Sequence, residues 1–309
     1  MTTSILLIVG GLTAAILASR VVVERARAIV AGTSISPFVI GVILLAFGTD
    51  LPEIANSVAA SLSGHGDINV GDSIGSAVTQ STLILALLPL IGGAFAVDRR
   101  DAVSTGSATV LALLLGAGLM MDGDLTRIDG LLLVGFWALA FYAIFKVAPP
   151  EQLELPIEKQ PPRRTMTWLE AAGALAVVGG GAFAAVQGFV AIAESMELPE
   201  YVVSFFLASI GTSLPELVVD ATALRKGERQ MAIGGLLGAS LLDASVSIGS
   251  GPIIAPNDVT ADLALRGSLL GAVVLGVVAV VLAWRRRHDW RSAVLFIVLY
   301  AAFFPALLG

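Results

Sequence analysis

The sequence predicts an all-α polytopic membrane protein with ten transmembrane helices, arranged as two inverted-topology repeats of five helices whose broken helices meet at the midplane. Three observations support this prediction: charge is scarce, apolar runs recur regularly, and one motif is repeated. Of the 309 residues, 56% are hydrophobic and only 14% are charged, whereas soluble domains carry about 25% charged residues. Apolar runs such as residues 110–121 do not alternate with a period of two, which favours helices over the strands of a membrane barrel.

A helix needs roughly 20 largely apolar residues to cross a membrane. The first apolar run has no basic residue before it, and Arg20 follows it, which argues against a cleavable signal peptide. We therefore expect the first run to be a span. In chain order the predicted spans are about residues 4–22, 37–62, 69–90, 102–121, 128–147, 167–193, 200–224, 230–252, 262–284 and 291–307.

A proline-rich segment at residues 148–166 divides the ten spans into two sets of five. Its prolines and mixed charges are typical of an irregular linker. We expect a first five-helix half at residues 1–147, with its repeated region at 37–90. The second half should cover residues 167–309, with its repeated region at 200–252.

The basic residues are segregated to one predicted side of the membrane. Every Lys and Arg except Arg127 and Arg266 falls in or beside loops on that side. Basic loops face the cytoplasm, so we expect a protein of the cell membrane with both termini outside the cytoplasm. The two histidines, His65 and His288, fall in predicted loops and are expected to be solvated. The chain has no cysteine, which excludes thiolate metal sites and cysteine nucleophiles.

An internal repeat links the two halves. Residues 41–80 align with residues 204–243 without a gap, so every aligned pair is separated by the same distance along the chain, which we call the repeat offset. Both copies contain Gly-Thr-x-Leu-Pro-Glu, at residues 48–53 and 211–216. The copies begin five spans apart, so they should enter the membrane from opposite faces. Inverted repeats of transporters place the substrate site near the midplane, where the copies meet.

The repeated motif predicts a break in each helix. Pro52 and Pro215 lack a backbone N–H and clash with the carbonyl one turn earlier, which should free carbonyls near residues 45–49 and 208–212. Free backbone at membrane depth is tolerated only where it is buried in protein or lines a cavity. With threonine hydroxyls and neighbouring carboxylates it forms an oxygen-only ligand set, which suits hard cations such as Ca²⁺, Mg²⁺ and Na⁺.

Six acidic residues lie inside the predicted spans of the two repeated regions, away from the first and last residues of those spans, and no Lys or Arg lies at a similar depth. Intramembrane carboxylates mark ion or proton pathways. They cannot all stay ionised in a low dielectric unless cations or protons compensate them. The main candidates are Asp50, Glu53, Glu216 and Asp243. Two further candidates, Asp72 and Asp220, lie nearer the ends of their spans.

The second copy resembles the alpha-repeat signature of the cation/calcium exchanger superfamily, especially prokaryotic sodium/calcium exchangers. Residues 208–216 match that signature almost unchanged, and residues 226–234 are similar too. The resemblance implies a 5+5 inverted fold with four clustered cation sites, in which Glu53 and Glu216 share the central divalent ion. The other ligands it implies are Asp243, Gln80 (where the family has Asn), Thr49, Thr212, Ser213 and Ser76.

Several positions depart from the family pattern. Asp50 stands where the family usually has Ser, and Ala239 where a second Ser is usual. The remaining departures are Asp72 for Asn, Asp220 for Ser and Gly235 for Asn. The site should therefore be more anionic than that of a standard sodium/calcium exchanger, and an extra cation or a proton must balance it.

The leading prediction is a secondary active antiporter that exchanges Na⁺ for Ca²⁺ by alternating access. Its expected partners are these inorganic cations and the lipid bilayer, with no cofactor, no nucleic acid and a monomeric functional unit. Asp50 keeps H⁺-coupled exchange, and exchange of Mg²⁺ or K⁺, open. A channel is disfavoured because clustered carboxylates bind ions tightly. An intramembrane enzyme is disfavoured because Asp72 lacks the complete Gly-x-Gly-Asp context and no His-Glu-x-x-His is present.

Overall fold

The computed structural model describes residues 2–30, 35–148, 164–195 and 209–308 of the chain. These residues are almost entirely helical, with one pair of two-residue strands. Seven of the described helices are long and apolar enough to cross a membrane, or eight if the bent pair Pro37–Thr49 and Leu51–Leu62 forms one span. The helical membrane class is therefore confirmed, whereas the number of ten spans stays a prediction.

The first half contains a long first helix, two composite helices and two straight helices. Helix α1 (Thr2–Val30) comes first. The broken helix that follows comprises α2 (Pro37–Ile40), the π-helical turn η1 (Gly41–Leu45), α3 (Ala46–Thr49) and α4 (Leu51–Leu62). The rest of the half comprises α5 (Gly66–Thr79), the π-helical turn η2 (Gln80–Ile84), α6 (Leu85–Ile91), α7 (Arg99–Leu119) and α8 (Arg127–Val147).

The second half follows the same plan. Most of the predicted linker, and the start of the span expected at 200–224, lie outside the described residues. The described elements are α9 (Arg164–Ser195), α11 (Leu214–Arg225), α12 (Arg229–Leu242), the π-helical turn η4 (Asp243–Ser247), α13 (Ile248–Ile254), α14 (Ala261–Trp284) and α15 (Trp290–Leu308).

The repeat offset recurs in the element boundaries. Helices α4, α5 and α6 and the turn η2 begin and end at the positions that the repeat aligns with the ends of α11, α12, α13 and η4 respectively. The turn between each helix pair has a glycine with positive φ, 75° at Gly64 and 86° at Gly227, a region that glycine enters without steric cost. The sequence repeat is therefore also a repeat of local structure.

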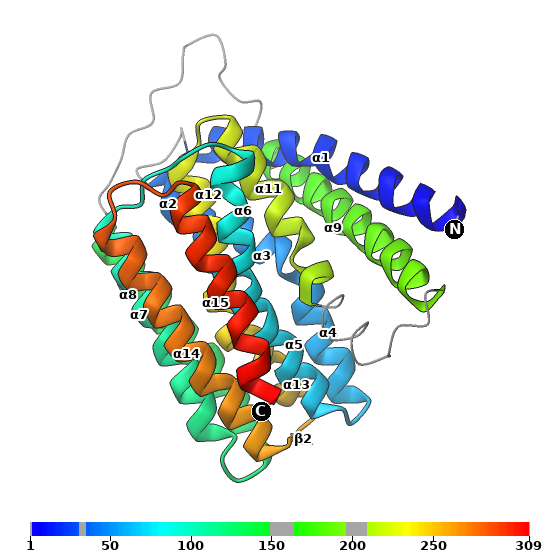
Figure 1. Cartoon of the computed structure of the whole chain (residues 1–309), viewed down its shortest axis with the longest axis vertical. Coiled ribbons are helices and arrows are strands. Elements are labelled where there is room, and N and C mark those ends of the chain that lie inside the picture. The colour runs from blue at the N-terminus through cyan, green and yellow to red at the C-terminus, as the bar shows by residue number, and fades with distance from the viewer. Residues whose placement is uncertain (1, 31–34, 149–163, 196–208, 309) are drawn as a thin grey trace.

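These two equivalent turns lie at opposite ends of the helical bundle (Figure 1). Near the first turn, strand β1 (Asp124–Leu125) pairs with β2 (Asn257–Asp258), and the Thr260 backbone N–H donates to Asp67 Oδ1 at 2.6 Å. Near the second turn, Lys226 Nζ donates to Glu24 Oε1 at 2.9 Å. We call the end of the bundle at the first turn the β end and the end at the second turn the basic end.

Glycines let the broken helix cross α12 at close range. A Cβ on Gly234 would press on the Phe38 carbonyl, and a Cβ on Gly238 would lie 2.7 Å from the Val42 Cα. Every residue from Met231 to Leu242 is buried. Helix α12 therefore forms the centre of the molecule, and η1 is held directly against it.

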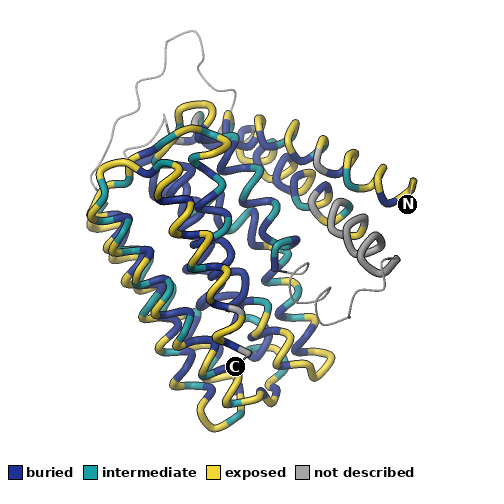
Figure 2. Tube along the Cα trace, in the orientation of Figure 1, coloured by how far each residue is buried: buried dark blue, intermediate teal, exposed yellow. Residues whose placement is uncertain are grey.

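Helices α1 and α9 pack side by side along one flank of the bundle (Figure 1). Their contact is close at Gly181, where a Cβ would lie 3.0 Å from the Ala15 backbone nitrogen, and Arg25 Nε lies 2.7 Å from Glu170 Oε2. Large apolar side chains such as Leu6 and Leu17 are exposed, and exposed residues follow the outer faces of the helices (Figure 2). Such a surface suits lipid rather than water.

His288 corrects the expectation that both histidines are solvated. His65 is exposed, but His288 is 0% exposed. Its backbone pairs with Phe95, its ring centroid lies 5.4 Å from that of Phe95, and its Nδ1 lies 3.3 Å from Ser292 Oγ. Burial, followed by the charge of Arg285, lowers the pKa of this imidazole.

Candidate cation site

Both repeated motifs interrupt their helices where the prolines predict. Asp50 has φ −82° and ψ 1° between α3 and α4, and Ser213 has φ −82° and ψ 5° just before α11. The first break bends the helix by 48°. Because proline has no N–H to donate, Pro52 and Pro215 leave the carbonyls one turn earlier without their helical donor.

Each break places a glutamate in the first turn of a new helix. Glu53 lies in the first turn of α4, and Glu216 lies in the first turn of α11. The N-terminus of a helix carries a partial positive charge, which favours a nearby carboxylate. The two glutamates are therefore positioned by the same local structure in both halves.

Three carboxylates meet at the breaks. One oxygen each from Asp50, Glu53 and Glu216 lies within 4.8 Å of the other two, and each residue is at most 1% exposed. We call these residues the carboxylate group. Among the described residues, neither oxygen of either glutamate accepts a hydrogen bond. Three buried acids without a basic partner repel one another, so a bound cation or proton must offset their charge.

The π-helical turns bring two further predicted residues to this centre. Gln80 and Asp243 are the first residues of η2 and η4, and both are 0% exposed. Gln80 Nε2 donates to Asp50 Oδ1 at 3.4 Å, and Asp243 lies close to Gln80 and Ser247. A π-helical turn inside an α-helix frequently marks a functional site.

The predicted hydroxyl ligands differ between the halves. Ser76 Oγ lies 3.2 Å from Thr212 Oγ1, but Ala239, the counterpart of Ser76 in the repeat, offers no hydroxyl. Thr49, the counterpart of Thr212, instead donates to the Leu45 carbonyl at 2.9 Å. Ser213 is fully buried, and its Oγ has no hydrogen-bond partner within the described ranges.

Asp72 and Asp220, the two outlying candidates, lie outside the carboxylate group. Asp72 is half-buried, and its Oδ2 accepts a hydrogen bond of 2.6 Å from Asn56 Nδ2. Asp220 is 1% exposed, and neither of its oxygens has a partner in the part of the chain that the structure describes. The structure therefore separates these two from the other predicted acids.

Four polar residues at the centre escaped the sequence analysis. Ser247 is buried beside Asp243, Asn56 holds Asp72, and Ser81 Oγ donates to Ser240 Oγ at 2.8 Å. The sequence could have indicated Ser247 and Asn56 as members of the site. Ser247 lies one helical turn after Asp243, and Asn56 lies directly before the counterpart of Asp220. The contact between Ser81 and Ser240 joins opposite halves and had no local signal.

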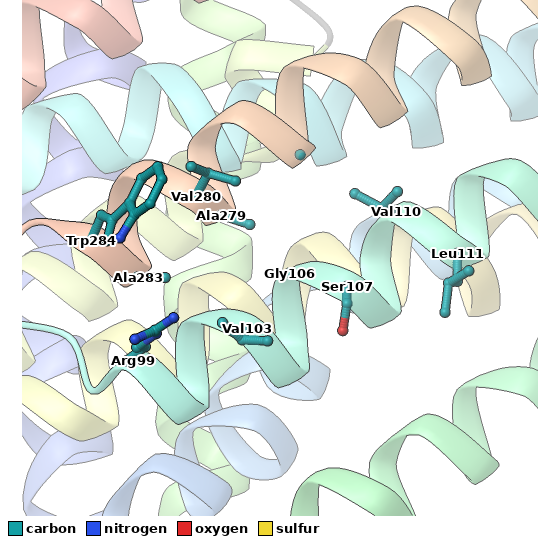
Figure 3. Close-up of a pocket in the computed structure, with 11 residues that line it drawn as sticks. Arg99, Val103, Gly106, Ser107, Val110, Leu111, Ala279, Val280, Ala283 and Trp284 are labelled. Atoms are coloured by element: carbon teal, nitrogen blue, oxygen red, sulfur yellow. The ribbon is translucent and has the colours of Figure 1, made fainter.

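A cavity of about 570 Å³ lies between α7 and α14, away from this centre. Figure 3 shows its walls, with Val103 and Val110 on α7 facing Val280 on α14, and with Arg99 and Trp284 at one end. None of the predicted cation ligands lines it. Its apolar walls suit lipid or another apolar group rather than a bare cation.

Comparison with known proteins identifies the family. The family model described as sodium/calcium exchanger protein matches residues 3–146 and 167–308. The putative antiporter CaxA of Alkalimonas amylolytica is 32% identical over 80% of this chain and 79% of its own length. The inner membrane protein YrbG of Escherichia coli K12 is 30% identical over 82% of this chain and 80% of its own.

The fold agrees with this assignment. A structure of the sodium-calcium exchanger NCX_Mj superposes with a TM-score of 0.80 at 25% identity, covering 98% of each chain. The family match, the two relatives and this structural likeness extend over most of the sequence. The chain belongs to the sodium/calcium exchanger protein family.

Proposed function

We propose that this protein is a secondary active antiporter that exchanges Na⁺ for Ca²⁺ by alternating access. The observation that carries the proposal is the buried carboxylate group, which offers oxygen ligands from both halves within 4.8 Å of one another. Oxygen-only sites with several carboxylates suit Ca²⁺. The names of the relatives, a putative antiporter and a sodium-calcium exchanger, support the same activity.

Charge balance gives the exchange its physical basis. Glu53 and Glu216 would share the divalent ion, with Asp50 and Asp243 adding negative charge around it. The neutral oxygens of Thr49, Thr212, Ser213, Ser76 and Gln80 would complete the coordination. Either one divalent ion or several monovalent ions can neutralise such a site, but leaving it empty exposes buried charges to one another. Each ion set therefore favours release of the other, and transport couples the two.

The proposed architecture is the ten-span inverted repeat. The matching element boundaries support it, as does the placement of the equivalent turns at opposite ends. In this arrangement, α1 and α9 move together across the central helices. Leu175 of α9 would act as a gate in this motion, because its side chain occupies the space beside Gly48, with Leu175 Cγ 3.0 Å from where a Gly48 Cβ would lie.

Uptake of labelled Ca²⁺ into proteoliposomes tests the proposal. Vesicles loaded with Na⁺ and diluted into Na⁺-free buffer should accumulate Ca²⁺, and vesicles with equal Na⁺ on both sides should not. A proton ionophore should leave the Na⁺-driven uptake unchanged. Equal uptake driven by a proton gradient in the absence of Na⁺ would overturn Na⁺ coupling while leaving cation antiport intact.

Asp50 supports a second candidate, exchange coupled to protons or to another cation. Its Oδ1 accepts from Gln80, and its Oδ2 is buried without a partner among the described side chains. A fourth acid beside Glu53, Glu216 and Asp243 needs one more positive charge in at least one transport state. Replacing Ca²⁺ by Mg²⁺, and Na⁺ by K⁺ or by a pH step, in the same assay separates these alternatives.

A further inference from the structure

We propose that Asp220 and Asp72 form two additional binding stations for a divalent cation, one on each side of the carboxylate group. Asp220 would receive the cation on its way to and from the basic end, and Asp72 would do so on its way to and from the β end. The inference rests on the proposed cation antiport and adds to it the residues that select the ion on each path.

Position in the repeat is the first argument. The repeat offset makes Ser57 the counterpart of Asp220 and Gly235 the counterpart of Asp72. In the second half the two positions face each other, since a Cβ on Gly235 would lie 2.5 Å from Asp220 Oδ1. In the second half, therefore, the small residue lies directly beside the acid. The acid lies on α11 in the second half, at Asp220, and on α5 in the first half, at Asp72. Ser57, the counterpart of Asp220 on α4, instead accepts a hydrogen bond at its Oγ from the Gly251 N–H at 3.0 Å.

Burial is the second argument. Asp220 is 1% exposed and, within the described ranges, neither carboxylate oxygen has a hydrogen-bond partner. Asp72 Oδ1 is buried and likewise lacks a partner among the described residues, while Asn56 Nδ2 orients the other oxygen at 2.6 Å. A structural carboxylate in a protein interior is normally paired or hydrogen-bonded. These two acids therefore keep carboxylate oxygens that accept no hydrogen bond from the described residues, as a transient cation site requires.

Placement along the helices is the third argument. Asp220 lies one turn beyond Glu216 on α11, in the direction of Arg225, where that helix ends. Asp72 lies one turn before Ser76 on α5, in the direction of the turn at the β end. One turn of a helix advances about 5–6 Å. The negative charge of Asp220 acts on Glu216, and that of Asp72 acts on Glu53 and Asp243, so a cation at either station would be attracted by the carboxylate group as well.

The test measures Ca²⁺ affinity separately at the two faces. Inside-out and right-side-out membrane vesicles would be prepared with the wild type, Asp220→Asn or Asp72→Asn, and assayed by exchange of labelled for unlabelled Ca²⁺, which needs no coupling ion. Asn keeps the shape of Asp and removes its charge. Asp220→Asn should raise the apparent KM at the face of the basic end roughly three- to tenfold, and Asp72→Asn should do the same only at the opposite face.

A rescue variant separates binding from a structural role. In Asp220→Ser/Gly235→Asp the acid moves to the helix that bears it in the first half, and the shorter serine vacates the space beside residue 235. This double variant should recover most of the wild-type KM at the basic face, whereas Asp220→Ser alone should not. A KM unchanged at both faces in Asp220→Asn and Asp72→Asn, or raised equally at both, would overturn the stations. A wild type without Ca²⁺ exchange would overturn the proposed function and the stations together.

Discussion

At the scale of single residues, the two motifs differ at one chemically decisive position. Asp50 and Ser213 occupy equivalent breaks with nearly identical backbone angles, yet one adds a negative charge and the other a hydroxyl. The sequence alone revealed this difference, because the motifs align without a gap. It could not show that Gln80 would donate to Asp50, since that contact depends on how the two composite helices pack.

Neutralising either central glutamate should abolish divalent transport. Glu53→Gln and Glu216→Gln each remove one of the charges that would hold Ca²⁺, and we expect uptake to fall roughly a hundredfold or more, because carboxylate count sets Ca²⁺ affinity. Labelled Ca²⁺ uptake at matched protein density measures the loss. Asp262→Asn, which affects an exposed pair with Arg266, serves as the control. Full uptake by either glutamine variant would remove that glutamate from the site.

Replacing Asp50 by serine should reveal which ion balances it. Asp50→Ser introduces the residue that the second motif has at Ser213, and the loss of charge should remove one compensating cation. If that cation is Na⁺, the Hill coefficient for Na⁺ should fall; if it is H⁺, the dependence of uptake on pH should flatten. The two titrations are made on the same vesicles. A variant that changes neither would show that Asp50 carries no coupling ion.

The burial of His288 predicts a dependence of stability on pH. Its pKa is lowered by burial, so the unfolded chain binds a proton more readily than the folded protein does. The stabilisation is complete above the ordinary pKa of about 6.5 and is lost as the pH falls below it towards the folded value. Thermal unfolding in detergent should show a Tm that falls as the pH is lowered through this range. His288→Gln should reduce this slope, and an unchanged slope would contradict the assignment.

At the scale of elements, the sequence predicted the breaks but not the π-helical turns. The effect of a proline on a helix is local, so Pro52 and Pro215 predicted where the helices would be interrupted. The turns η2 and η4, which begin at Gln80 and Asp243, contain no proline or glycine that could have indicated them. They depend instead on packing around the centre. The burial of His288 escaped prediction for the same reason, because Phe95 comes from a distant loop.

The crossing of the broken helix over α12 should tolerate no added side chain. Gly234→Ala would press a methyl group on the Phe38 carbonyl, and overpacking of this kind typically costs about 1–3 kcal/mol. We expect a lower Tm in detergent. Gly135→Ala in α8 is the matched control because, apart from the neighbouring backbone of its own helix, no heavy atom of the described structure lies within 4 Å of its added Cβ, and it should leave Tm unchanged or raised. Equal effects would show that the crossing can relax.

At the scale of the whole molecule, the sequence predicted the helical membrane class and the family, and the comparisons confirm both. The alternation of basic and non-basic loops along the sequence predicts that the loops gather at two opposite ends. Lys226 contacts Glu24 at the basic end, and β1 pairs with β2 at the β end. The meeting of Asp50, Glu53 and Glu216 was foreseen only through the repeat and the family resemblance. Spacing along one chain cannot give the distance between two halves.

Transport by movement of α1 and α9 predicts that a link between α1 and the core blocks it. Ser19 Oγ lies 2.7 Å from Thr222 Oγ1 of α11, so Ser19→Cys/Thr222→Cys should form a disulfide in this cysteine-free chain. Oxidation should stop Ca²⁺ uptake, and reduction should restore it. The control, Ser81→Cys/Ser240→Cys, replaces a pair at 2.8 Å within the central helices, and its oxidation should leave its own uptake unchanged. Uptake that survives oxidation of the first pair would rule out this motion.

The shared element boundaries also bear on how the protein reaches its second state. Leu175 occupies the space beside Gly48, and the repeat offset relates Leu12 to Leu175 and Gly48 to Gly211. If the two halves exchange conformations, the contact at Gly48 opens and an equivalent one forms at Gly211. The outward- and inward-facing forms would then be near copies of each other with the halves interchanged. Their free energies would differ only through the residues at which the halves differ, and Asp50 and Ser213 are one such pair beside the proposed ion site.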